Sequence, residues 1–173
     1  MLTPYNFQKE AEGKISQIIL RDMDQRTMFP GNVNPNNILY CAPTGAGKTI
    51  TMENLIAKIN NNGDPLIYTD VNGKSPSVEL PRVLFVILSP NSLDRQMISS
   101  MKAHGIGAEI GLNVLSSDDL SHTKQLHAGD VIVANWSAIN SEKNRIRQDG
   151  DLTVGLKSLI ADAKGRGIAV ILF

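Results

Sequence analysis

The 173-residue chain has a hydrophobic fraction of 42%, which is ordinary for a globular domain and argues against a disordered or fibrous protein. Lysine plus arginine equals aspartate plus glutamate at 17 each, so no overall positive field draws the chain to nucleic acid or anionic lipid. A single cysteine excludes an internal disulfide framework, and no apolar run reaches the roughly 20 residues that cross a bilayer. We therefore expect one compact cytoplasmic domain that does not enter a membrane.

The N-terminal part of the chain alternates helical and turn-forming patterns. Between Tyr5 and Arg26, apolar residues recur at three- and four-residue spacings, which predicts an amphipathic opening helix. Its inward stripe would hold Phe7, Ala11, Ile15, Ile18, Ile19 and Met23. Turn formers fill residues 29–37, and the apolar residues 38–41 then predict a short buried strand. A second helix is predicted from Thr49 to Ile59.

The rest of the chain continues as strands and helices in alternation. Residues 64–82 contain three prolines and little periodicity, which predicts an insertion or a hairpin around 66–68. Strands are then expected at 83–88, 110–115, 131–134 and 168–173, and helices at 92–101 and 154–164. Because wholly apolar strands bury both of their faces, they require a mainly parallel sheet with helices on both sides. The predicted fold class is α/β, a doubly wound domain.

One short segment carries a chemical signature. Residues 42–49 read Ala-Pro-Thr-Gly-Ala-Gly-Lys-Thr, between a predicted strand and a predicted helix. Backbone N–H groups at a helix N-terminus hold a polyphosphate well, and glycines with positive φ let the main chain approach it. In such a loop the lysine reaches the β- and γ-phosphates, and the threonine hydroxyl ligates Mg²⁺. The predicted ATP site is Pro43, Thr44, Gly45, Ala46, Gly47, Lys48 and Thr49, with Lys48 and Thr49 catalytic and Thr49 also the metal ligand.

The segment resembles the first motif of superfamily 2 helicases and translocases, above all the DEAD/DEAH-like and type III restriction enzyme Res-subunit branch, although Ala42 replaces the usual first glycine. The resemblance implies a RecA-like P-loop NTPase fold with ATP and Mg²⁺ as cofactors. It implies one N-terminal RecA-like lobe over residues 1–173. Residues 1–36 would form the entry helix and loop, and residues 37–173 the P-loop core, with a possible insertion at 60–82.

Three further segments are similar to motifs of the same family. Residues 2–11 look like its entry helix, whose glutamine reads the adenine edge and matches Gln8. Residues 86–96 and 131–139 resemble strand ends that contact a nucleic-acid backbone, with Ser89, Asn91, Asn135 and Ser137 as the matching residues. Simpler alternatives remain open: an exposed Gln8 with no role, a capping turn at 89–92, and a Trp136 that packs on the sheet instead of stacking on a base.

The resemblance implies that the full-length protein hydrolyses ATP to move along nucleic acid, with DNA favoured over RNA, and that it works with a second RecA-like lobe. The family's acidic motif would follow Phe173, so we expect a fold incomplete at its C-terminus that binds nucleotide but scarcely turns it over. A small-molecule kinase and a non-hydrolytic nucleotide-dependent binding module remain alternatives. Helix N-capping accounts for Asp118 and Asp119 without catalysis, and the histidines are assigned no metal.

Overall fold

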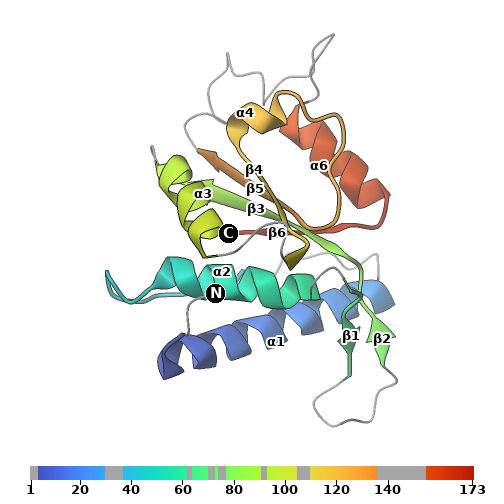
Figure 1. The fold of residues 1–173 in the computed structure, drawn as a ribbon. Helices are drawn as coiled ribbons and strands as arrows, with labels where there is room; N and C mark the ends of the chain where they lie inside the picture. The colour runs from blue at the N-terminus through green and yellow to red at the C-terminus, as the bar shows by residue number, and fades with distance from the viewer. Residues whose placement is uncertain are drawn as a thin grey trace. The chain divides into compact units, whose positions relative to one another are not determined.

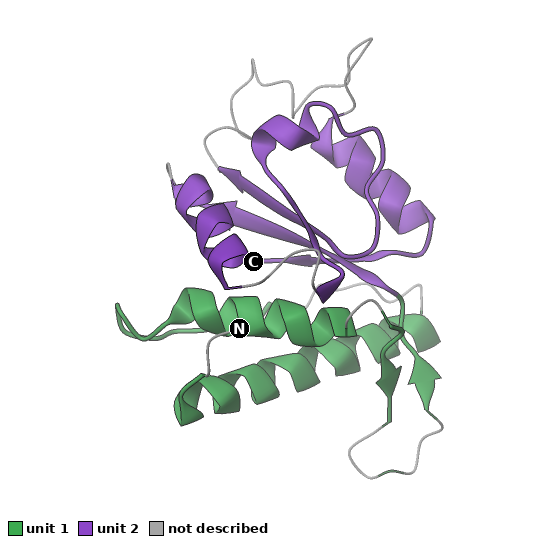
Figure 2. Ribbon diagram, viewed as in Figure 1, with its two compact units in different colours: residues 1–81 green, residues 82–173 purple. Residues whose placement is uncertain are grey.

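A computed structural model describes residues 4–29, 37–61, 64–69, 73, 77–90, 93–104, 110–135 and 155–173. The chain divides into two compact units, Met1–Pro81 and Arg82–Phe173, which Figure 2 shows in different colours. The prediction of a single lobe over residues 1–173 therefore stays a prediction, and each unit has its own architecture.

The first unit is built on two helices and a small hairpin (Figure 1). Helix α1 (Asn6–Met28) packs along helix α2 (Lys48–Asn60), and strands β1 (Ile67–Tyr68) and β2 (Val78–Glu79) pair antiparallel. Both predicted helices and the predicted hairpin are confirmed.

The buried face of α1 differs from the expected apolar stripe. Met23 is buried as expected, but the side chain of Phe7 is 51% exposed and that of its neighbour Gln8 only 3%. The buried residues of α1 include two further polar ones, Ser16 and Asp24. A helix buries the side that its neighbours cover, and polar groups on that side are tolerated when they find hydrogen bonds. The Ser16 hydroxyl, for example, donates to the Gly13 carbonyl at 3.0 Å.

The strand predicted over residues 38–41 is absent, so this prediction is wrong. The segment has no regular secondary structure, Leu39 is 88% exposed and Ile38 is 39% exposed. A strand is stabilised by the ladder that it forms with a neighbour, and apolar composition alone supplies none. In the described residues, this stretch pairs with neither sheet.

The second unit contains a four-stranded sheet that is parallel throughout. Its strands lie in the order β4 (Asn113–Leu115), β5 (Asp130–Asn135), β3 (Val83–Ser89) and β6 (Ala169–Leu172). Because all the neighbouring pairs are parallel, each connection must cross over the sheet. Helices α3 (Leu93–Ala103), α4 (Ser117–Leu120) and α6 (Leu156–Gly165) make these crossovers. The predicted α/β class and parallel sheet are confirmed.

Side chains of the central strands β3 and β5 alternate between the two faces of the sheet, and an apolar layer covers each face. On one face Leu84, Val86, Ile132 and Ala134 form a buried cluster with Leu120 of α4 and with Leu156, Leu159 and Ala163 of α6. Figure 1 shows α3 on the other face, where Met101 is fully buried. Strands β3 and β5 are buried along almost their whole length, which explains why both are continuous apolar runs in the sequence.

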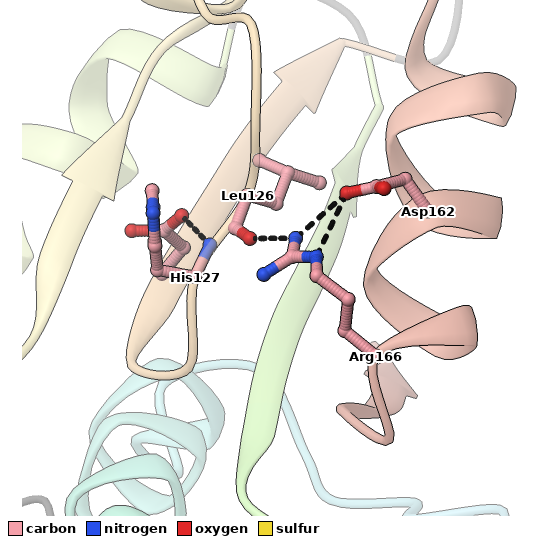
Figure 3. Close-up of polar contacts among 5 residues, drawn as sticks. Leu126, His127, Asp162 and Arg166 are labelled. Carbon is pink, nitrogen blue, oxygen red and sulfur yellow. Dashed lines mark hydrogen bonds and ion pairs between the residues drawn. The ribbon is translucent and has the colours of Figure 1, made fainter.

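A polar network ties α6 to the turn before β5 (Figure 3). The guanidinium of Arg166 pairs with Asp162 at 2.8 Å and donates to the main-chain carbonyl of Leu126. On the other side of the turn, the buried Asp130 carboxylate accepts from the His127 N–H at 2.6 Å and from Asn113 at 3.0 Å. These bonds fix where β5 enters the sheet.

We expect Arg166→Ala to lower the free energy of unfolding by about 1–2 kcal/mol, because a charged hydrogen bond to a carbonyl of the core is lost while the half-exposed ion pair adds little. Urea unfolding measures the change. Lys164→Ala is the matched control, since Lys164 is exposed on the same helix and its loss should stay within about 0.5 kcal/mol. Equal effects of the two substitutions would show that the Leu126 contact contributes nothing.

Helix α4 begins with the cap that the sequence suggested. The Asp119 N–H donates to the Ser116 hydroxyl at 3.2 Å, and the Asp119 carboxylate accepts from the Ser116 hydroxyl at 2.6 Å and from its N–H at 2.8 Å. The prediction that capping explains Asp119 is confirmed. The side-chain hydrogen bond, and then the main-chain one, hold the pKa of this carboxyl below its usual range.

The pKa of Asp119 should therefore lie below the ordinary value of an aspartate. Because the pKa is depressed by folding, the cap contributes fully above the unfolded value and its contribution is lost as the pH falls through the folded value. Ser116→Ala removes one of the two donors, and the pKa should then rise toward the ordinary value. An NMR titration of the carboxyl carbon measures both, and an unchanged pKa in Ser116→Ala would refute this account.

Candidate functional site

The segment 42–47 is a tight turn that leads directly into α2. Gly45 and Gly47 both have left-handed backbone conformations, with φ of +82° and +73°. The Ala46 N–H donates to the Pro43 carbonyl at 3.2 Å, which closes the turn. Gly47 is the N-cap of α2, and the helix begins at Lys48. The two glycines are required here because other residues rarely adopt such conformations.

Lys48 bends back over this turn. Its ammonium donates to the Ala42 carbonyl at 2.7 Å and to the Pro43 carbonyl at 3.1 Å. Within the part of the chain that the structure describes, these two bonds use two of the three ammonium donors, and the side chain stays exposed. The lysine is therefore hydrogen-bonded to two carbonyls of the loop, and its positive charge remains exposed to solvent. The two acceptors are main-chain carbonyls, which is why no pattern in the sequence predicted them.

The start of α2 has the properties of an anion site. The first N–H groups of a helix have no partner within it, and the helix dipole places partial positive charge there. No acidic residue lies in the first turn of α2, so no carboxylate of that turn neutralises this charge. Thr49, at the second helical position, is half-buried, while Pro43, Thr44 and Gly45 are exposed.

Gln8 reaches the same loop from α1. Its amide nitrogen donates to the Ala46 carbonyl at 3.0 Å, and its amide oxygen accepts from the Tyr5 N–H at 2.7 Å. The second bond caps the N-terminus of α1. The structure thus brings Gln8 to the loop 42–47, across 38 residues of sequence, and uses both ends of its amide.

Two of the residues expected to face nucleic acid lie together in the second unit. Ser89 ends β3 and Asn135 ends β5, and the two are direct partners in the parallel register. Ser89 is buried and Asn135 is half-buried. In parallel sheets ligands bind beyond the carboxyl ends of the strands, which is where this pair lies. Asn91, Ser137 and Trp136 lie outside the described residues.

The described residues show neither a metal-binding cluster nor a membrane span. They contain no group of three or more His, Cys, Asp and Glu side chains placed to hold a metal ion. None of their helices combines the length and apolar character that a bilayer span requires.

A parallel sheet covered by helices, together with a glycine loop that opens a helix, defines the class of α/β proteins to which helicase-type domains belong. The family model for the type III restriction enzyme, res subunit, matches residues 2–162, and the chain belongs to this family. The fold is therefore RecA-like, and the chain is an ATP-dependent helicase-like N-terminal domain. Comparisons with curated proteins and with solved structures found no match.

Proposed function

We propose that this chain is the ATP-binding lobe of a nucleic-acid-dependent ATPase, a DNA helicase or translocase that serves a restriction system. The observation that carries the proposal is the loop 42–47, which passes through two left-handed glycines into the first turn of α2 with Lys48 folded over it. Membership of the Res-subunit family supports the same function.

The loop fits the triphosphate of a nucleotide. A Cβ at Gly45 would meet nothing within 4 Å, so the space beside the main chain of Gly45 is open. The N–H groups at the start of α2, together with the third donor of the Lys48 ammonium, supply donors for phosphate oxygens. Pro43, Thr44 and Ala46 would line the rest of the bound triphosphate, and the Thr49 hydroxyl would be the ligand for Mg²⁺. Magnesium ATP supplies the phosphoanhydride whose cleavage drives such motors.

Nucleic acid would be contacted at the carboxyl edge of the sheet in the second unit. The half-buried Asn135 offers a small polar group that suits a sugar-phosphate backbone, and the buried Ser89 is its neighbour in the register. Asn91 and Ser137, which follow the same two strand ends in the sequence, would extend this surface. The net charge of zero agrees with a local contact, since no global attraction is present. DNA is the proposed nucleic acid along which the motor moves, and a second RecA-like lobe is the proposed partner that completes hydrolysis.

A titration with a fluorescent ATP analogue tests the proposal. With Mg²⁺ present, the chain should bind the analogue saturably, and unlabelled ATP and inorganic tripolyphosphate should both displace it, because the loop recognises the phosphates. Adenosine should displace it poorly. Failure of the chain to bind the analogue at millimolar concentration, with folding confirmed by circular dichroism, would overturn the proposal.

A further inference from the structure

Among the described residues, the Gln8 side chain of α1 bonds to the loop 42–47, the proposed phosphate loop. The Gln8 amide is almost fully buried, with 3% of the residue exposed, and lies against the main chain of Ala46 and Gly47. A Cβ built on Gly47 would overlap the Gln8 amide nitrogen and lie 3.5 Å from its amide carbon. Gln8 therefore packs directly on the one loop residue that also caps α2.

The hydrogen bond to Ala46 fixes the orientation of a whole peptide unit. The Ala46–Gly47 peptide is trans and planar, so its carbonyl and its N–H point in opposite directions. Because the Ala46 carbonyl points at Gln8, the Gly47 N–H must point away from Gln8. Gly47, which has no Cβ, would otherwise let this peptide plane rotate at small cost.

We infer that Gln8 is a positioning residue for phosphate binding, because it holds the Ala46–Gly47 peptide so that the Gly47 N–H remains a donor to the anion. The inference rests on the proposed nucleotide site and adds to it. In this role Gln8 supports the binding of the phosphates whatever base the nucleotide carries. Its second bond, to the Tyr5 N–H, anchors the amide to the first turn of α1 and keeps its nitrogen aimed at the loop.

The two roles that Gln8 can have differ in their ligand dependence. A residue that only reads adenine affects ATP and leaves GTP and tripolyphosphate unchanged. A residue that orients the loop affects all three by the same factor. Gln8→Met keeps the size of the side chain but removes both hydrogen bonds, and we expect it to weaken the binding of ATP, GTP and tripolyphosphate by about 3- to 10-fold each. Gln17→Met, on the exposed side of the same helix, is the matched control and should change none of them.

A spectroscopic measurement separates positioning from general loss of structure. In a ¹⁵N-labelled wild-type chain, tripolyphosphate should shift the Gly47 amide resonance strongly, and in Gln8→Met this shift should be much reduced while the helix content is unchanged. Should Gln8→Met fail to fold, Gln8→Glu keeps the acceptor for the Tyr5 N–H, loses the donor to Ala46, and is expected to weaken all three ligands.

The possible outcomes separate failure of this inference from failure of the proposed function. Loss of ATP binding alone, with tripolyphosphate binding intact in both variants, would overturn the inference and leave the nucleotide site in place. A loss for all three ligands with a further loss for ATP supports the inference and adds base recognition. Absence of tripolyphosphate and ATP binding in the wild-type chain would instead defeat the proposed function.

Discussion

Replacing Lys48 with alanine is expected to weaken the binding of magnesium ATP by about 10- to 150-fold, which corresponds to the loss of about 1.5–3 kcal/mol for hydrogen bonds between charged groups. The ammonium is the positive side chain that clasps the loop, and it lies at the first position of α2. It therefore adds a full charge to the partial charge of the helix terminus. The titration with the fluorescent analogue measures the change.

The structure separates this effect from a loss of stability. The bonds of Lys48 to the Ala42 and Pro43 carbonyls are exposed, so their removal should lower the free energy of unfolding by less than about 1 kcal/mol. Lys58→Ala is the matched control, since Lys58 lies on the same helix and pairs with Glu12 at 3.5 Å. Its affinity for ATP should equal that of the wild type. Wild-type affinity in Lys48→Ala as well would refute the assigned role of the lysine.

Gly47→Ala is expected to be the most damaging substitution in the loop, and Gly45→Ala a much milder one. Both residues have positive φ, which costs a residue with a Cβ about 1–2 kcal/mol. The Cβ at Gly47 would in addition overlap Gln8, whereas the Cβ at Gly45 would enter open space. We expect Gly47→Ala to lower the free energy of unfolding by about 1.5–3.5 kcal/mol, the sum of the strain and of the hydrogen bond to Ala46 that is lost when the Gln8 amide is displaced.

A double-mutant cycle tests whether the overlap with Gln8 causes the larger effect of Gly47→Ala. If the overlap with Gln8 is responsible, Gln8→Ala should cost less in the Gly47→Ala background than in the wild type, because the smaller side chain relieves the clash. Urea unfolding of the four proteins gives the coupling free energy. The same Gln8→Ala change in the Gly45→Ala background serves as the control, and there the costs should add. Equal destabilisation by both glycine substitutions would contradict the packing argument.

The sequence was most informative where structure depends on adjacent residues. The glycines at 45 and 47, followed by Lys48 and Thr49, predicted a turn that opens a helix, and the helix begins at Lys48. The run 83–88 predicted the central strand β3, because a strand buried on both faces needs apolar side chains throughout. Family membership confirms the resemblance and the α/β class that these motifs implied.

Other features depended on partners far away in the chain. The apolar residues 38–41 form no strand, and Phe7 of α1 is exposed although its hydrophobicity predicted an inward position, while Gln8 beside it is buried. A strand needs a neighbouring strand to pair with, and a helix buries the face that its neighbours cover. The composition of either segment does not say which neighbours are present.

By itself, the amino-acid sequence determined the fold class and the loop that opens α2, since these follow from local backbone preferences and from the periodicity of apolar residues. Its motifs also resembled those of the family whose model matches residues 2–162. Only the tertiary structure decided that Ser89 and Asn135 are partners at one edge of the sheet, and that Gln8 holds Ala46. Such contacts join residues 38 or more positions apart, and they form only when the chain has folded and the distant main-chain groups have been brought within hydrogen-bonding distance.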